Sequence, residues 1–175
     1  IGGFEPGELI VVGARPSMGK TAFALNIAEY VAFYAEMPVV FFSLEMTSKQ
    51  IVTRLLGSHQ RIHLDHLKRG TLNQEEWSKV ASGVTFINNS SFYIDNSPYL
   101  TLSMLRDRAI SLVSEVKQIG LIIVDPIQLM TPEKEFENRY QEMAAVSRGL
   151  KLLAKELNCP VVAVSQLNRF LEQRP

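Results

Sequence analysis

Residues 9–21 read LIVVGARPSMGKT and decide the fold of this 175-residue chain. Residues 9–13 are apolar and rich in β-branched side chains, which predicts a short buried strand. The loop that follows ends in Gly19-Lys20-Thr21, and residues 20–34 then read as a helix that is apolar on nearly every side. Such a helix is expected to be enclosed by other elements. The order of strand, loop and helix is the context in which Gly-Lys-Thr binds phosphate.

The loop departs from the usual phosphate-binding pattern at one position. The pattern is a glycine, four residues and then Gly-Lys-Ser/Thr, and Ala14 replaces the first glycine. Gly19 lets backbone amides turn inward around an anion, and the helix N-terminus adds a partial positive charge. We expect Lys20 to reach the β- and γ-phosphates and the Thr21 hydroxyl to bind Mg²⁺. The loop therefore predicts a site for a nucleoside triphosphate.

Apolar runs alternate with helical patterns along the rest of the chain, which predicts a parallel sheet covered by helices on both faces. The connections are expected to be right-handed crossovers. Together these features predict a single α/β domain over residues 1–175. Four more strands are expected at residues 39–43, 92–95, 121–125 and 161–165, and further helices at residues 48–57, 74–82, 101–117 and 139–157.

Composition limits the class of protein. Hydrophobic residues make up 46% and charged residues 21%, which is typical of a globular domain. The 18 Lys and Arg balance the 18 Asp and Glu, which excludes a uniformly basic nucleic-acid-binding surface but not a local basic patch. The single cysteine, Cys159, and the lack of an apolar run of about 20 residues favour a cytoplasmic protein that does not cross a membrane. The chain starts without Met and is expected to be a piece of a longer protein.

Three polar side chains stand at or just past the ends of predicted strands. Asp125 ends an apolar strand, at the sheet edge where α/β proteins bind ligands, and is predicted to hold the metal, Mg²⁺. Glu45 lies just past another strand, where a carboxylate is costly unless it faces a polar site, and we predict it to be the general base. Gln166 follows Ser165 and is a candidate sensor of the terminal phosphate. Taken alone, an ordinary surface Gln is nearly as good an interpretation of Gln166.

Several stretches together resemble the bacterial replicative DNA helicases of the DnaB family, in their C-terminal RecA-type ATPase domain. The phosphate loop alone indicates only some phosphate-loop NTPase, whereas its combination with the other stretches is far more specific. The matching stretches are residues 2–28 (GGFEPGELIVVGARPSMGKTAFALNIA), 41–46 (FFSLEM), 122–130 (IIVDPIQLM), 147–157 (SRGLKLLAKEL) and 165–169 (SQLNR).

The resemblance implies a motor that hydrolyses ATP with Mg²⁺ and moves along single-stranded DNA as a homohexamer. It also implies that primase and a helicase loader bind through other parts of the full-length protein. By resemblance, Lys20, Glu45 and Gln166 are catalytic, while Thr21 and Asp125 support the metal. The arginine finger and the main DNA loop are expected beyond Pro175, so residues 1–175 alone are expected to show weak or no DNA-stimulated hydrolysis. The positions that contact ATP are Ala14, Arg15, Pro16, Ser17, Met18, Gly19, Lys20, Thr21 and Ala22.

Other interpretations share parts of this pattern. A RecA-type recombinase or a clock-type ATPase has the same fold and the same Glu, although SLEM and DPIQLM favour the helicase. A nucleotide-binding assembly module without turnover is disfavoured by Glu45. A small-molecule kinase is less favoured because no insert with clustered Arg follows the loop. In the recombinase and helicase class, the strand ending at Ser165 is expected between the phosphate-loop strand and the Asp125 strand.

Two polar stretches are given no catalytic role. His59, His63 and His66 have the spacing of one helix face, but residue 60 is Gln and no acidic ligands follow, so a solvated helix face is favoured over a zinc site. Residues 131–138 (TPEKEFEN) are expected to form a mobile loop, and their acids argue against a chief role in binding DNA phosphates. Arg169 is the other candidate for contact with DNA.

Overall fold

The computed structural model describes residues 3–167 and has a five-stranded, fully parallel sheet in the order β1-β5-β4-β2-β3. This confirms the predicted α/β class. It also confirms that the strand ending near Ser165 lies between the phosphate-loop strand and the Asp125 strand. The strands are β1 (Leu9–Ala14), β2 (Val39–Ser43), β3 (Phe92–Asp95), β4 (Leu121–Asp125) and β5 (Val161–Gln166).

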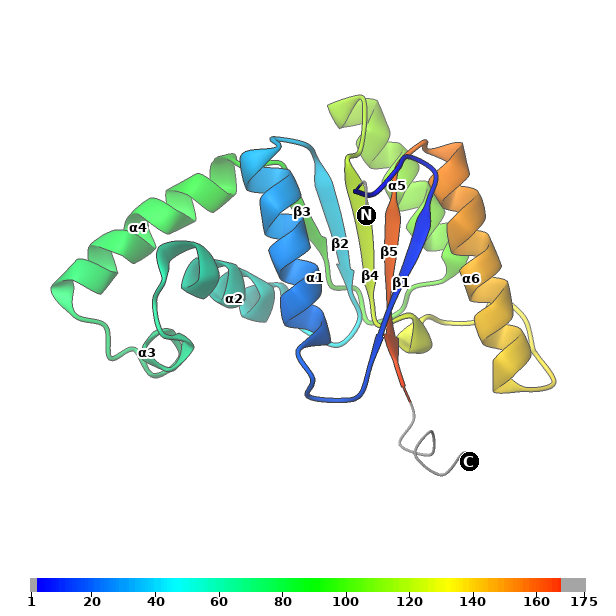
Figure 1. Ribbon diagram of the computed structural model, residues 1–175, viewed down its shortest axis with the longest axis horizontal. Coiled ribbons are helices and arrows are strands. Elements are labelled where there is room, and N and C mark those ends of the chain that lie inside the picture. Colours follow the sequence, from blue (N-terminus) through cyan, green and yellow to red (C-terminus); the bar gives the residue numbers. More distant parts are fainter. Residues whose placement is uncertain (1–2, 168–175) are drawn as a thin grey trace.

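Helices cover both faces of the sheet (Figure 1). One face packs against α1, α2 and the π-helix η1, and the other packs against α5 and α6. The short 3₁₀ turn η2 follows β4 directly. The bounds are α1 (Lys20–Glu29), η1 (Tyr30–Tyr34), α2 (Ser48–Gln60), α3 (Leu64–Arg69), α4 (Gln74–Asn89), α5 (Leu102–Val116), η2 (Ile127–Leu129) and α6 (Arg139–Glu156).

The continuous apolar strands are explained by burial on both faces. In β2, Val39 and Phe41 pack into the core with α1 and α2, while Val40 and Phe42 pack into the core with α5 and α6. All four side chains are at most 5% exposed. Because successive side chains of a strand point to opposite faces, only a sheet covered on both sides requires apolar residues at every position.

The expectation that the helix at residues 20–34 is enclosed is wrong. Ala24, Leu25 and Ala28 are buried against the sheet, but Phe23 is 54% exposed and Tyr30 is 65% exposed. The physical reason is that the helix contacts β1, β4 and β5 through one side only, which leaves Phe23 and Tyr30 exposed on the rest of its surface. An all-round apolar sequence therefore does not mean all-round burial here.

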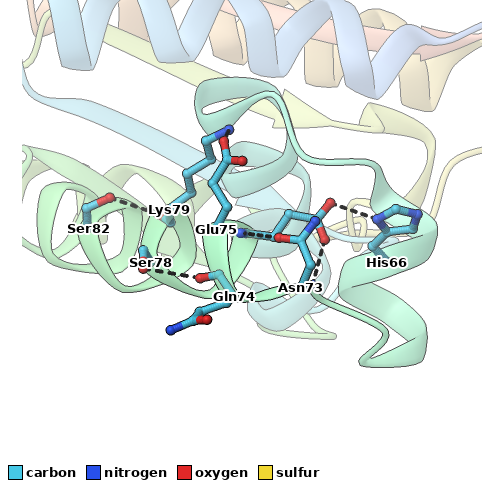
Figure 2. A network of polar contacts seen from close by, with 8 residues as sticks. His66, Asn73, Gln74, Glu75, Ser78, Lys79 and Ser82 are labelled. Carbon is cyan, nitrogen blue, oxygen red and sulfur yellow. Dashed lines mark hydrogen bonds and ion pairs between the residues drawn. The ribbon is translucent and has the colours of Figure 1, made fainter.

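Helices α2, α3 and α4 extend away from the sheet on the α1 side (Figure 1). Of these, α3 was not predicted from the sequence. Glu76 joins α3 to α4: His66 Nδ1 lies 2.7 Å from Glu76 Oε1, and Asn73 caps α4 by accepting from the Glu76 N–H at 2.8 Å. Figure 2 shows His66 and Asn73 at this junction. The hydrogen bond from the Asn73 N–H to Glu76, followed by the contact with His66, lowers the pKa of Glu76. These polar contacts hold α3 against the start of α4.

The three histidines do not share a helix face, so that expectation is wrong. Helix α2 ends at Gln60, Arg61 has a left-handed backbone, and a second helix starts at Leu64. The His59 ring stacks on Phe86 at 4.5 Å, and its side chain is only 17% exposed. Within residues 3–167, no group of three or more His, Cys, Asp or Glu is placed to hold a metal ion.

The thiol of Cys159 lies in the core. It is 1% exposed, and burial raises its pKa to about 12, so this thiol is an inert core residue.

No helix in the described part of the chain is long and apolar enough to cross a membrane.

Candidate nucleotide-binding site

The phosphate loop connects the end of β1 to the start of α1. Gly19 caps α1 with a φ of 83°, a left-handed conformation that glycine adopts without steric cost. The Gly19 carbonyl accepts the first helical hydrogen bond, from the Phe23 N–H at 2.9 Å. Lys20 Nζ donates to the Arg15 carbonyl at 3.3 Å, which folds the lysine back over its own loop. The free N–H groups of the first turn of α1 therefore lie at the loop, as anion binding requires.

A cavity of about 510 Å³ opens at this loop. It gathers Lys20, Thr21, Glu45 and Gln166, which come from three separate parts of the sequence. Of the nine predicted ATP contacts, Ala14, Arg15 and Met18 lie outside the lining, and Met18 is 72% exposed. The full lining is Pro16, Ser17, Gly19, Lys20, Thr21, Ala22, Glu45, Met46, Gln50, Arg54 and Gln166.

Thr21 and Asp125 are joined by the shortest side-chain contact at the site. The Thr21 hydroxyl donates to Asp125 Oδ2 at 2.6 Å, across 104 positions of sequence. Asp125 is 3% exposed, and its second oxygen, Oδ1, is buried without a hydrogen-bond partner. An unpartnered buried carboxylate oxygen is costly, and it suits a hydrated divalent cation held next to the Thr21 hydroxyl. The residues present therefore fit Mg²⁺.

The pKa of Asp125 is raised, mainly because burial penalises the charged carboxylate. The hydrogen bond from Thr21 opposes this rise, the Glu45 carboxylate adds to it, and Lys20 and Arg54 oppose it. A cation bound at this point would remove the penalty, because it stabilises the ionised form of both carboxylates. The electrostatics of the protein itself thus favour a positive charge beside Asp125.

Glu45 and Gln166 reach the cavity from strand ends. A tight turn after β2 places Glu45, since Ser43 Oγ donates to the Met46 carbonyl at 2.8 Å. The Leu44 N–H donates to the Asp125 carbonyl at 2.9 Å, which ties this turn to the end of β4. In β5, Gln166 pairs directly with Ala14 of the phosphate-loop strand. Strand order therefore brings together residues that the sequence could only propose separately.

Sequence reasoning missed two polar residues of the cavity lining, and a third, Gln128, that lies outside the lining. Gln50 and Arg54 line the cavity from α2 and lie four positions apart, so they share one helix face. That spacing, directly after Glu45, was a usable signal. Gln128, in η2, bonds to the end of β5. It lies in the family-like stretch 122–130, but nothing in that stretch indicated its role, because its partners lie 37 and 38 positions away. Arg169 lies outside the described residues.

Comparison with known proteins identifies the family of the chain. A family model described as the DnaB-like helicase C-terminal domain matches residues 1–175. The chain belongs to this family. This DnaB-family domain is 47% identical over 173 residues to the replicative DNA helicase DnaB of Buchnera aphidicola subsp. Schizaphis graminum. It is also 47% identical over 174 residues to the replicative DNA helicase DnaB of Pasteurella multocida.

The match covers nearly all of this domain but a minor part of its relatives. It spans 98% of this chain and 37% of the length of each of these two helicases. Among solved structures, a DnaB-like replicative helicase, studied with its interactions with primase, has a TM-score of 0.91 and 31% identity over 98% of this chain and 42% of its own. A second solved structure, of an ATPase domain, has the same TM-score and identity, over 98% of this chain and 61% of its own. The DnaB-family domain therefore has the RecA-type ATPase fold.

Replacing the buried carboxylate tests the electrostatics of the site. We expect Asp125→Asn to raise the free energy of unfolding of the nucleotide-free protein by about 1 kcal/mol, or about 2–4 °C in Tm. The amide oxygen still accepts from Thr21, while the penalised negative charge is gone. Thermal unfolding measures this change, with Asp107→Asn, an exposed change of the same type on α5, as the control.

The pH dependence has a defined sign. Because the pKa of Asp125 is raised in the fold, its contribution to stability falls as pH rises from its ordinary value of 3.8 through the folded value. The Asn variant is expected to lack this loss. Lower stability in Asp125→Asn at neutral pH would show that the charge is already compensated in the native protein.

Proposed function

We propose that this domain binds ATP with Mg²⁺ and hydrolyses it to drive movement of a replicative helicase along single-stranded DNA. The observation that carries this proposal is the convergence of Lys20, Thr21, Glu45 and Gln166 on one cavity, with the Thr21–Asp125 bond at its edge. The replicative helicases related to this domain supply the DNA part of the proposal.

Each polar side chain has a role that its position supports. Lys20 and the amides of the phosphate loop bind the β- and γ-phosphates, and Thr21 and Asp125 hold Mg²⁺, which neutralises charge on the phosphate oxygens. Glu45 accepts a proton from the attacking water. Gln166 bonds to the terminal phosphate, and Arg54 offers a positive charge to the same end of the nucleotide.

The partners follow from the same family. We propose a homohexamer on single-stranded DNA, as the family resemblance implies. We also propose primase as a partner, because a DnaB-like relative was studied with its interactions with primase. The position of Glu45 in the cavity disfavours a module that binds ATP without turnover. The family match disfavours a recombinase or a clock-type ATPase.

Phosphate release from ATP, with and without a single-stranded oligonucleotide, tests this function in the protein. We expect hydrolysis that requires Mg²⁺. It should rise with DNA in a full-length helicase that contains this domain, whereas residues 1–175 alone should respond weakly or not at all. Tight ATP binding without phosphate release would support the non-hydrolysing module instead. Hydrolysis by that full-length helicase that does not respond to DNA would contradict the helicase assignment while leaving the nucleotide site intact.

A further inference from the structure

Gln128, in η2, forms side-chain hydrogen bonds to the end of β5, although the two lie 37 and 38 positions apart in the sequence. Its side-chain oxygen accepts from the Gln166 N–H at 3.0 Å, and its side-chain nitrogen donates to Ser165 Oγ at 2.8 Å and to the Gln166 carbonyl at 3.4 Å. These partners fix the orientation of the amide, because only one assignment of its oxygen and nitrogen satisfies them all. The Gln128 side chain therefore both donates hydrogen bonds to the end of β5 and accepts one from it, as the backbone of a neighbouring strand does.

The backbone of Gln128 makes a second connection, to the start of α6. Its carbonyl accepts from Arg139 Nη2, and Arg139 Nη1 bonds to the carboxylate of Glu142, which is 8% exposed. The ion pair with a nearly buried carboxylate orients the guanidinium toward Gln128. Arg139 is the first residue of α6, so it also marks the end of segment 131–138.

Segment 131–138 is anchored separately at its start. The Thr131 N–H donates to the Leu100 carbonyl at 2.8 Å, and Glu133 Oε1 accepts from the Ser103 N–H at 2.6 Å. The remainder of the segment is exposed apart from Phe136, and it walls a cavity of about 590 Å³. At its far end, Asn138 Oδ1 accepts from the Gln141 N–H and Glu137 Oε2 accepts from Gln141 Nε2, both at 3.0 Å. Arg139, next to this end, is the residue that links it to Gln128.

We propose that Gln128 is a positioning residue that transmits the state of the nucleotide site to segment 131–138 through Arg139. The proposal rests on the proposed function, in which Gln166 contacts the terminal phosphate. Hydrogen bonds weaken steeply with distance and angle, so a shift of β5 on binding or losing that phosphate must move Gln128 or break its bonds. The same shift then reaches the Arg139 guanidinium and the segment before it.

A fluorescent label on the segment tests the connection without relying on turnover. Glu135 is exposed, so Glu135→Cys accepts an environment-sensitive thiol label, whereas Cys159, the only native cysteine, is buried and stays unreacted. A non-hydrolysable ATP analogue with Mg²⁺ is then titrated. We expect a saturable emission change in the labelled protein with Gln128 intact.

Gln128→Ala is expected to lose most of this emission change while its Kd for the analogue stays within about twofold. Arg139→Ala is expected to do the same, and the double variant to lose no more than either single one. Gln128→Glu keeps an acceptor for the Gln166 N–H but removes the donor to Ser165, so partial retention is expected. Gln118→Ala and Arg148→Ala, exposed changes of the same types elsewhere, are expected to keep the full response.

The possible outcomes distinguish this proposal from the proposed function on which it rests. Failure of the labelled protein to bind the analogue overturns the proposed nucleotide site, and the inference with it. Binding with no emission change, or a full change in both Gln128→Ala and Arg139→Ala, overturns the role of Gln128 alone. Because Arg139 is exposed at a helix start, its variant decides the question even if Gln128→Ala unfolds.

Discussion

Lys20→Ala is expected to lower kcat for ATP hydrolysis by about 10²–10³ and to weaken ATP binding as well. In the proposed function, the change removes the charge-assisted contact of Lys20 to the β- and γ-phosphates, which no other lysine of the cavity lining replaces. The fold should survive, since the Lys20 ammonium donates to the Arg15 carbonyl of its own loop, at 3.3 Å, rather than to a distant element. Phosphate release and nucleotide binding measure the two losses.

Lys49→Ala is the matched control for that experiment. Lys49 is exposed on α2, close to the site but outside the lining of the cavity, and it carries the same charge. Its removal is expected to leave both the activation free energy of ATP hydrolysis and the free energy of unfolding within about 0.5 kcal/mol of the native values. Normal turnover by Lys20→Ala would contradict the assignment of residues 14–21 as the phosphate loop.

Most of the fold could be predicted because its signals are local. A strand buried on both faces must be apolar throughout, so β2 and β4 were predicted with their observed bounds. The helix predicted at residues 101–117 is α5, which begins at Leu102 because the Thr101 hydroxyl caps it by accepting from the Met104 N–H at 3.2 Å. Helix α3 was missed, because six residues with no buried side chain leave no periodic apolar pattern to detect.

The candidate site was predictable in its parts but not in its connections. Lys20 and Asp125 could be recognised locally, as part of a loop motif and as a charged strand end. The bond between Thr21 and Asp125 depends on strand order, and Gln128 depends on how η2 folds back on β5. Contacts that span 104 or 37 positions leave no trace in local spacing. Exposure of α1 was misjudged for a similar reason, since tertiary packing alone decides which side of the helix the sheet covers.

Glu45→Gln is expected to separate binding from chemistry. The amide keeps the size and most of the hydrogen bonding of the carboxylate, but it cannot accept a proton from the attacking water. Turnover is therefore expected to fall by about 10²–10⁴, while ATP still binds. Single-turnover hydrolysis and equilibrium binding of ATP measure the two quantities on the same preparation. Glu115→Gln, an exposed change of the same type on α5, is the control.

The surroundings of Glu45 add a second readout to this experiment. Burial is the main reason that the pKa of Asp125 is raised, and the Glu45 carboxylate contributes to the same rise. In Glu45→Gln that contribution disappears, so Asp125 should ionise at a lower pH than in the native protein. Metal binding should therefore extend to lower pH, even though hydrolysis is lost. A collapse of ATP affinity instead, with no separate loss of turnover, would make Glu45 a binding residue and leave the general base elsewhere in the cavity.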